Sequence, residues 1–124
     1  HPHIIHIADF DMLADGTPYL VLELLRGESL RDRLARGRLA LDEAVEIATQ
    51  VGSALGAAHA HGVIHRDLKP ANVFLIHSDP PSAMRYHVKV LDFGIAALPY
   101  TETLATLSQF PGTPQYMAPE QLDG

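Results

Sequence analysis

The chain has 124 residues, which suits a single domain, and its 47% hydrophobic and 19% charged residues indicate a globular rather than a disordered protein. Its formal net charge of −6 argues against nucleic-acid binding, because phosphate neutralisation needs a basic surface, so no nucleic-acid partner is expected. The absence of cysteine excludes disulfides and thiol chemistry, and no apolar run reaches the roughly 18 residues of a membrane span, so no membrane segment is expected in this chain.

The first 25 residues predict a β-hairpin. Two runs rich in β-forming side chains, 4–12 and 18–25, lie on either side of the turn pair Asp15-Gly16. The chain opens directly on this strand-like pattern, with HPHIIH in place of a methionine or a signal peptide. We interpret it as a piece of a longer protein.

Two helices are expected after the hairpin. Ser29 and Asp32 resemble a capping box at the start of the first helix, and Gly37 ends it. Asp42 is the expected N-cap of the second and longest helix, whose Gly52 and Gly56 either mark close packing against a neighbour or are simply tolerated. The apolar stripe of this helix consists of Ala44, Ile47, Ala48, Val51, Leu55 and Ala58.

A charged loop between two apolar arms comes next, VIHRDLKPANVFL over 63–75. Short strands are expected over 72–76 and 87–93, joined by SDPPSAM, where the proline pair excludes a continuing strand. The remainder, 94–124, has little periodicity and contains four prolines. It predicts a loop of about 25 residues, a length that is usually functional or disordered.

The polar residues of these loops suggest phosphoryl transfer. Asp67 and Asn72 lie five positions apart with Lys69 between them, and Asp92 follows the next pair of strands. Two carboxylates and an amide oxygen suit a hard cation such as Mg²⁺, and a neighbouring lysine suits a phosphate. Gly94, directly after a metal carboxylate, permits a backbone turn that a side chain would forbid. Metal, phosphate, base and loop together describe phosphoryl transfer.

Three motifs, HRDLKPAN, DFG and GTPQYMAPE, resemble the catalytic loop, the metal-binding motif and the end of the activation segment of protein kinases. They occur in that family's order, and the resemblance covers essentially the whole chain. It implies an α+β, protein kinase-like fold in part. Residues 1–25 would form the end of the N-lobe hairpin and the hinge. Residues 26–124 would run from the start of the C-lobe, with its long helix, through the activation segment.

The resemblance also implies roles for single residues. Asp67 matches the aspartate that accepts the proton of the substrate hydroxyl, and Asn72 and Asp92 match the metal ligands. Lys69 matches a lysine on the transferring phosphate, and Thr113 the threonine that links to it; together they favour a serine/threonine kinase over a tyrosine kinase. The implied cofactors are ATP and Mg²⁺ or Mn²⁺, and the implied partner is a protein with a Ser or Thr acceptor.

Further positions match the ATP pocket and the regulatory parts of the family. Leu22 matches the gatekeeper, Glu23 to Leu25 the hinge that bonds adenine, and Phe74 the floor beneath the ring. His65, Phe93 and Ile7 match a stacked column that fixes the metal motif, Arg66 matches an arginine that pairs with activation-loop phosphate, and Glu120 matches a structural ion-pair residue. The candidate phosphosites, ranked by their distance from Thr113, are Thr106 and Ser108, then Thr101 and Thr103.

Parts of the kinase pattern do not occur in these 124 residues. There is no GxGxxG, and neither Lys69 nor Lys89 has the context of the lysine that binds the α- and β-phosphates. Elements that would cover the long helix and the run 19–25 are also missing, which predicts exposed apolar surface. We therefore expect no phosphate transfer by this chain alone. Asn72 and Asp92 are 20 positions apart (92 − 72), more than is usual, and we assign the excess to SDPPSAM as a surface insertion.

Three hypotheses follow. The first is the middle of a serine/threonine kinase domain, bacterial in type and cytoplasmic, from an active parent that is either membrane-anchored or not. The second is a non-catalytic, truncated or pseudokinase-like module that binds nucleotide or a protein partner. The third is a histidine-based zinc protein built on HPHIIH and HAHGVIH, which the lack of cysteine disfavours. The basic stretch Arg31, Arg33, Arg36 and Arg38 suits a solvated helix face better than a docking site.

Overall fold

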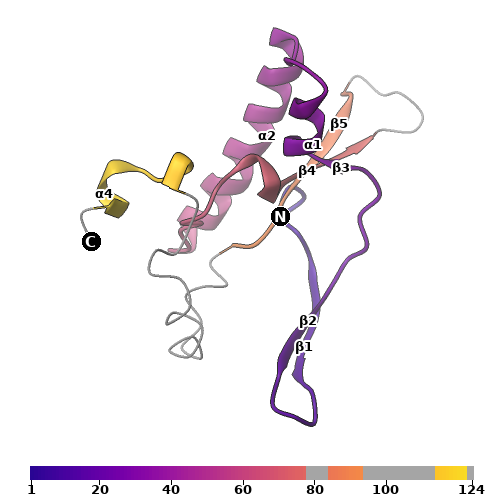
Figure 1. Ribbon diagram of the computed structural model, residues 1–124, viewed down its shortest axis with the longest axis vertical. Coiled ribbons are helices and arrows are strands. Elements are labelled where there is room, and N and C mark those ends of the chain that lie inside the picture. Colours follow the sequence, from indigo (N-terminus) through magenta and orange to yellow (C-terminus); the bar gives the residue numbers. More distant parts are fainter. Residues whose placement is uncertain (78–83, 94–113, 123–124) are drawn as a thin grey trace.

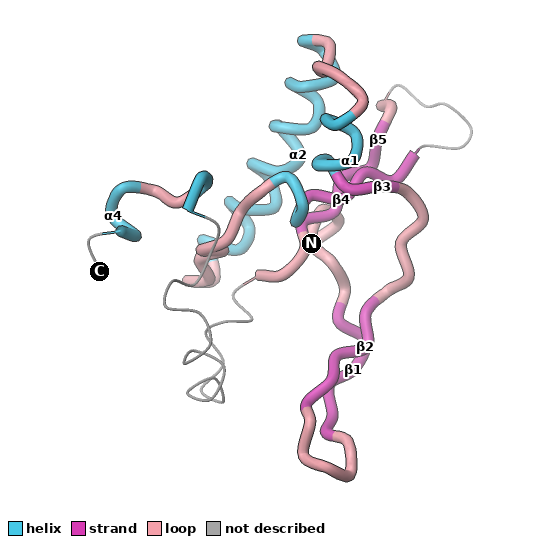
Figure 2. Tube along the Cα trace, viewed as in Figure 1, coloured by secondary structure: helices cyan, strands magenta, loops and turns pink. Residues whose placement is uncertain are grey.

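The computed structural model describes residues 1–77, 84–93 and 114–122. Figures 1 and 2 show a long hairpin that points away from a second unit, in which α1 and α2 lie beside a small sheet. This mixture of helices and antiparallel strands agrees with the expected α+β class. The elements are β1 (Ile7–Met12), β2 (Pro18–Leu22), β3 (Glu28–Ser29), α1 (Leu30–Ala35), α2 (Leu41–Ala60), the 3₁₀ turn η1 (Pro70–Asn72), β4 (Val73–His77), β5 (Tyr86–Val90), the 3₁₀ turn η3 (Pro114–Tyr116) and α4 (Pro119–Leu122).

The hairpin of β1 and β2 forms as the sequence predicts. The strands pair antiparallel, from Ile7 opposite Leu22 to Met12 opposite Pro18. At the tip, the Asp15 carboxylate accepts the Thr17 N–H at 2.9 Å, and Gly16 takes a φ of +84°, which glycine adopts without strain. The strands are shorter than expected, because the ladder ends at Leu22 and residues 23–26 leave the sheet.

The second sheet has the order β3-β4-β5, with all neighbours antiparallel. On β5, Tyr86, Val88 and Val90 are buried while the residues between them are half-buried, the period-2 pattern of a strand with one covered face. That face packs against α2. The resulting core contains Ile47, Val73, Leu75, Tyr86 and Val88.

The cap of α1 follows the sequence pattern, but the cap of α2 does not. Ser29 caps α1, where its hydroxyl accepts the Asp32 N–H at 3.1 Å. The N-cap of α2 is Ala40, not Asp42, and the Glu43 side chain reaches back to accept the Ala40 N–H at 3.3 Å. Glu43 occupies the third position of the helix, from which a carboxylate can accept the N–H of the N-cap residue, as in a capping box.

The buried face of α2 also differs from the predicted stripe. Ala48 is exposed, so the predicted stripe is wrong at that position. Polar Glu43 and Gln50 are almost fully buried instead. Gly52 and Gly56 meet nothing at the position of an added Cβ, so these glycines are tolerated rather than required by packing. The buried residues of the helix are Glu43, Ile47, Gln50, Ala54 and Ala58.

Buried Glu43 is surrounded by donors. Its carboxylate accepts Arg33 Nε at 3.0 Å and Arg33 Nη2 at 2.9 Å, and the Tyr86 hydroxyl donates to it at 2.9 Å. Burial disfavours the charge of Glu43, but the hydrogen bonds from Tyr86 and Arg33 outweigh it and hold the pKa of this carboxyl below its usual value. This network fixes α1, α2 and β5 to one another.

Side chains of α2 close part of the outer edge of β5. Glu46 accepts the Tyr86 N–H at 3.0 Å, and the Gln50 amide oxygen accepts the Val88 N–H at 2.8 Å. The Gln50 amide nitrogen donates to the Tyr86 carbonyl at 2.9 Å. One helix face thus supplies the partners that a further strand would otherwise give to this edge.

The N-terminal segment closes the rest of that edge. The Val90 N–H donates to the His3 carbonyl at 2.8 Å, and the Ile5 N–H donates to the Val90 carbonyl at 3.0 Å. The His3 ring donates through Nδ1 to the Val88 carbonyl at 3.0 Å. Residues 3–5 therefore join the base of the hairpin to β5.

Exposed apolar side chains occur along the run 19–25 as predicted, but the predicted stripe of α2 is covered at Ile47 and Ala58. Leu24, after β2, is 88% exposed, and Leu41, at the start of α2, is 81% exposed. Every residue of β1 is exposed. Among the helices of the described residues, none combines the length and the apolar character needed to cross a bilayer.

Candidate active site

The loop between α2 and β4 gathers three of the predicted site residues. Lys69 Nζ lies 2.6 Å from Asp67 Oδ2. Asn72 Nδ2 donates to the Asp67 backbone carbonyl at 2.9 Å and to Asp67 Oδ2 at 3.3 Å. Pro70, at the first position of η1, starts the turn that ends with Asn72. The side chains of Asp67 and Lys69 remain about a third and a quarter exposed, at 33% and 24%.

Buried His65 holds this loop against the end of β5. Its Nε2 lies 2.9 Å from the Leu91 carbonyl, and its Nδ1 lies 3.3 Å from the Asp67 N–H. Because a carbonyl only accepts, Nε2 carries the proton and Nδ1 accepts from Asp67. The Leu91 N–H also donates to the Asn72 carbonyl at 2.8 Å. One imidazole and one backbone bond therefore connect the loop to the residue before Asp92.

Asn72 and Asp92 are 20 positions apart in the sequence, but strand pairing brings them to the same end of the sheet. Val73, the first residue of β4, pairs with Val90, the last residue of β5. Asn72 and Asp92 consequently lie at the same end of the sheet. The insertion expected between the strands falls mostly on residues 78–83, outside the described residues, and the antiparallel pairing of β4 and β5 is regular on either side of it.

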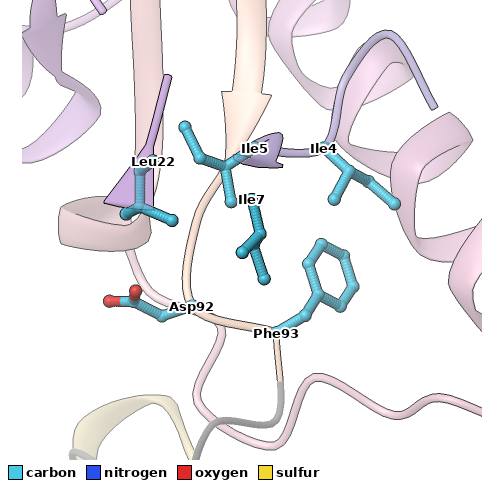
Figure 3. A pocket seen from close by; sticks show the side chains of 6 residues that line it. All are labelled: Ile4, Ile5, Ile7, Leu22, Asp92 and Phe93. Carbon is cyan, nitrogen blue, oxygen red and sulfur yellow. The ribbon is translucent and has the colours of Figure 1, made fainter. Parts of the chain in front are cut away.

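A largely apolar pocket lies next to Asp92. Its lining residues are Ile4, Ile5, Ile7, Leu22, Asp92 and Phe93. Figure 3 shows the side chain of Ile7 directed toward the Phe93 ring, while the Asp92 carboxylate turns the other way, toward the side of Leu22. The ring centroids of His65 and Phe93 are 4.7 Å apart. Ile7, Phe93 and His65, which the sequence predicts to form a stacked column, thus follow one another in space in that order.

Two non-glycine residues of the site have strained backbones. Arg66 has a φ of +64° and Asp92 a φ of +57°, in the left-handed region that side chains rarely adopt. These are the only such residues in the described part of the chain. Backbone strain of this kind is concentrated at functional sites, where surrounding contacts hold it in place.

The residues predicted to form the adenine pocket lie on two strands and the segment after β2. Leu22 ends β2, and Glu23 and Leu25 follow it outside both sheets, each half-buried. Phe74 lies on β4 and pairs with Lys89 on β5. Gly27 passes so close to β4 that an added Cβ would lie 2.0 Å from the Leu75 carbonyl oxygen.

Two contacts at the site were not predicted from the sequence. Lys89 Nζ lies 2.6 Å from Glu23 Oε1, so the lysine before DFG is paired with the expected hinge. Gln121 of α4 donates to the Arg66 carbonyl at 2.8 Å. No periodicity or motif points to either pair. The alternation of Lys89 with two valines predicts only that Lys89 lies on the opposite face of its strand from them.

Other predicted positions have different outcomes. Thr113 and the candidate phosphosites Thr101, Thr103, Thr106 and Ser108 lie outside the described residues. Glu120 makes no ion pair with described residues. The basic stretch is only partly a solvated face, because Arg33 pairs with Glu43 and Arg36 pairs with Glu28.

The histidine clusters do not form a zinc site within the described residues, where no group of three or more His, Asp or Glu side chains could hold a metal ion. His1 and His3 do come close, with ring centroids 5.6 Å apart, and His3 and His87 are 4.9 Å apart. The rings of His3 and His87 each bond a backbone carbonyl. His3 and His87 therefore link the N-terminal segment to β5.

Comparison with known proteins gives a consistent picture. The family model described as the protein kinase domain matches residues 1–124. The chain is 42% identical to serine/threonine-protein kinase PkaB of Streptomyces coelicolor over 127 residues, and 42% identical to serine/threonine-protein kinase PknA of Mycobacterium tuberculosis over 133 residues. Each alignment covers all of this chain but only 30% and 28% of the relative. The crystal structure of Rad53 1-466 in complex with AMP-PNP superposes with a TM-score of 0.72 at 33% identity, covering 99% of this chain and 28% of that chain.

Proposed function

The chain belongs to the protein kinase domain family, and on that premise we propose that it forms the central part of an ATP-dependent protein serine/threonine kinase. The reaction transfers the γ-phosphate of ATP to a Ser or Thr hydroxyl of a protein. Residues 1–25 supply the end of the N-lobe and the hinge, and residues 26–124 supply the C-lobe through the activation segment. Because ATP is cytoplasmic, we place this domain in the cytoplasm.

The observation that carries the proposal is the bonded group of Asp67, Lys69 and Asn72. Asp67 accepts the proton of the attacking hydroxyl and orients its oxygen. The Lys69 ammonium, 2.6 Å from Asp67, neutralises charge on the phosphate in transit. Asn72 fixes the loop through its two bonds to Asp67. Phosphoryl transfer depends mainly on such positioning and charge stabilisation, because the transferring group needs little covalent assistance.

The choice of Ser/Thr over Tyr rests on Lys69 and Thr113, which match the serine/threonine branch of the family. The named relatives PkaB and PknA are serine/threonine-protein kinases, which supports the same choice. Arg66 is exposed beside Asp67, and we propose that it binds a phosphate on the activation segment, with Thr106 or Ser108 as the first candidates.

We propose that adenine binds between the hinge and β4. Backbone groups of Glu23 to Leu25 bond the base, Leu22 borders the pocket, and Phe74 lies beneath the ring. The half-buried positions of Glu23, Leu25 and Phe74 suit residues that line an open pocket. The related Rad53 was crystallised in complex with AMP-PNP, which supports nucleotide binding by this fold.

The residues at the end of β5 fit a divalent cation. Asn72 uses Nδ2 to bond Asp67, which leaves its side-chain oxygen as the atom for a metal. Asp92 adds a carboxylate at the same end of the sheet. Mg²⁺ is commonly held by one or two protein oxygens together with substrate phosphates, and Mn²⁺ accepts the same donors. When bound, such an ion neutralises phosphate charge. The protein's part is to hold the two oxygens in place.

The test uses the protein encoded by the full reading frame, with γ-labelled ATP, Mg²⁺ and peptides that carry Ser, Thr or Tyr. Labelled phosphoserine or phosphothreonine is expected, without phosphotyrosine. Asp67→Ala should remove the label. Asp42→Ala, which changes an exposed carboxylate at the start of α2, should retain it. Label that survives Asp67→Ala would overturn the proposal.

A second candidate function is a nucleotide- or protein-binding module without transfer. It is favoured by the pairing of Lys89 with Glu23, which leaves neither lysine of the sequence in the role of an α/β-phosphate lysine. This candidate predicts saturable binding of ATP by the full-length protein with no labelled product. Translation of the flanking DNA separates the two, since a Gly-rich loop and a lysine upstream favour the kinase.

A further inference from the structure

We infer that the ion pair between Glu23 and Lys89 positions the nucleotide pocket, by fixing the hinge relative to Phe74 and Asp92. This inference rests on the proposed function and adds to it. Glu23 entered the sequence argument only through its backbone, and Lys89 only as a lysine in the wrong place for phosphate. In the structure, the side chains of these two residues bond each other.

The ammonium of Lys89 bonds both chain segments at the base of the hairpin, the one before β1 and the one after β2. It lies 2.6 Å from Glu23 Oε1, after β2, and 3.4 Å from the Ile4 carbonyl, before β1. Glu23 is tied to the segment before β1 as well, because its carboxylate accepts the His6 N–H at 2.8 Å and its own N–H donates to the His6 carbonyl at 3.1 Å. A single cation on β5 therefore fixes the base of the hairpin where it meets the second sheet.

The ion pair between Lys89 and Glu23 is partly shielded from solvent. The side chains of Lys89 and Glu23 are 13% and 30% exposed, whereas Arg85 and Asp42, an ion pair near the other end of β5, are 55% and 68% exposed. A partly enclosed pair is less screened by water and salt than a pair on the open surface. The hydrogen bonds from Lys89 and from the His6 N–H lower the pKa of Glu23, so the carboxylate is charged at neutral pH.

Lys89 is also placed to transmit the position of the hinge. It pairs with Phe74 across the β4–β5 ladder, so the two side chains share the sheet face on which adenine is proposed to lie. Asp92 follows Lys89 by three residues, and Asp92 lines the same pocket as Leu22, the neighbour of Glu23. The hinge segment 23–26 lies outside both sheets, so a side-chain tie has more effect there than in a strand. Without it, the hinge loses its side-chain bond to the strand that leads to Asp92.

The experiment compares nucleotide affinity in variants of the full-length protein. Lys89→Met keeps the length of the side chain and removes the charge, Lys89→Arg keeps the charge, and Glu23→Gln removes the partner. Arg85→Met is the matched control, because it removes a cation from an exposed pair near the same strand. The readouts are KM for ATP, KM for the peptide, kcat, and the Kd of a fluorescent ADP analogue, with Tm measured in parallel.

We expect Lys89→Met to raise KM for ATP and the Kd of the analogue by roughly fivefold, a modest coupling for adjoining charged groups, with KM for the peptide unchanged. Lys89→Arg should keep both values close to those of the wild type, and Arg85→Met should leave them unchanged. The Glu23→Gln, Lys89→Met double variant should be no weaker than Lys89→Met alone, because both changes remove one interaction.

The outcomes separate the inference from the proposed function. Wild-type protein that transfers phosphate, with Lys89→Met lowering only Tm, overturns the positioning role and leaves the kinase proposal intact. An equal shift in Arg85→Met also overturns it, because the effect is then one of general charge. Wild-type protein that binds the ADP analogue without transfer refutes the kinase proposal, and the Kd values still decide the role of the pair. Wild-type protein that binds no nucleotide refutes both.

Discussion

Gln50 offers the sharpest test of how the second sheet is held to α2. Its side chain bonds two buried backbone groups, the Val88 N–H at 2.8 Å and the Tyr86 carbonyl at 2.9 Å, and it is 5% exposed. Gln50→Ala leaves both groups without a partner in a buried place. Each unsatisfied group costs about 1–3 kcal/mol, so the free energy of unfolding should fall by about 2–6 kcal/mol.

The assay is urea unfolding followed by circular dichroism, with Thr49→Ala as the control. Thr49 is the neighbouring helix residue, is exposed, and within the described residues its hydroxyl donates to the Val45 carbonyl, one turn earlier, at 2.8 Å. Its replacement should change the free energy of unfolding by no more than about 0.5 kcal/mol. A loss in Gln50→Ala as small as that of the control would refute the idea that this amide closes the strand edge.

Gln50→Glu adds a test with a defined sign. An ionised carboxylate still accepts the Val88 N–H, but its second oxygen faces the Tyr86 carbonyl, which repels it. Burial and this repulsion raise the pKa of the introduced carboxyl in the folded state. The variant should therefore come close to wild type below the unfolded pKa of about 4.3, where the protonated group donates to Tyr86, and lose stability as the pH rises. A difference from wild type that is the same at all pH values would contradict the bonding scheme.

Further predictions follow from other parts of the molecule. Gly27→Ala places a Cβ 2.0 Å from a backbone oxygen of β4 and should lower the free energy of unfolding by about 2 kcal/mol or more, whereas Gly52→Ala, with open space around it, should raise it by up to about 1 kcal/mol; urea unfolding measures both. The donors around Glu43 lower its pKa, so its contribution to stability is present above the unfolded pKa and lost as the pH falls through the folded pKa; unfolding at pH 3 to 7 should show this loss, and Glu43→Gln should weaken it. A polypeptide of these 124 residues alone should incorporate no label from γ-labelled ATP, and label that disappears on Asp67→Ala would refute this. In the full-length protein, Asp92→Ala should abolish incorporation by removing the main proposed metal ligand.

Local patterns predicted the elements of the fold well, because local interactions decide them. The Asp15-Gly16 turn, the Ser29 cap and the two strands around the insertion all appear in the structure, and the family relation confirms the partial kinase fold. The errors arise where a contact that the simple pattern does not contain overrides the preference of a single residue type. Asp42 is a better cap by type than Ala40, yet Glu43 can serve the free N–H from inside the helix.

The buried face of α2 shows the same limit. A search for apolar periodicity selects Ala48 and passes over Gln50, although Gln50 is buried and Ala48 is exposed. Gln50 lies inside because β5 presents an edge whose backbone groups need partners. The sequence of the helix does not contain that requirement. It follows from the position of a strand that begins more than 30 residues later, at Tyr86.

The candidate site divides along similar lines. Motif spacing predicted that Asp67, Lys69 and Asn72 of HRDLKPAN lie close together, because this motif is short and contains its own turn. It did not predict the ties between motifs, such as His65 to Leu91 or Gln121 to Arg66. These ties join residues 26 and 55 positions apart, so they depend on how the elements pack.

The two strained residues indicate why those ties are needed. Arg66 and Asp92 both hold positive φ values, which cost free energy and persist only because neighbouring contacts prevent relaxation. Arg66 has its carbonyl bonded by Gln121, and the next residue, Asp67, donates its N–H to His65. Asp92 follows Leu91, whose carbonyl accepts from His65 and whose N–H donates to the Asn72 carbonyl. Each strained residue is therefore held next to a chemical group of the proposed reaction by bonds that originate outside its own motif. A change to His65 should disturb Arg66 and Asp92 together, because one ring nitrogen bonds the residue after Arg66 and the other bonds the residue before Asp92.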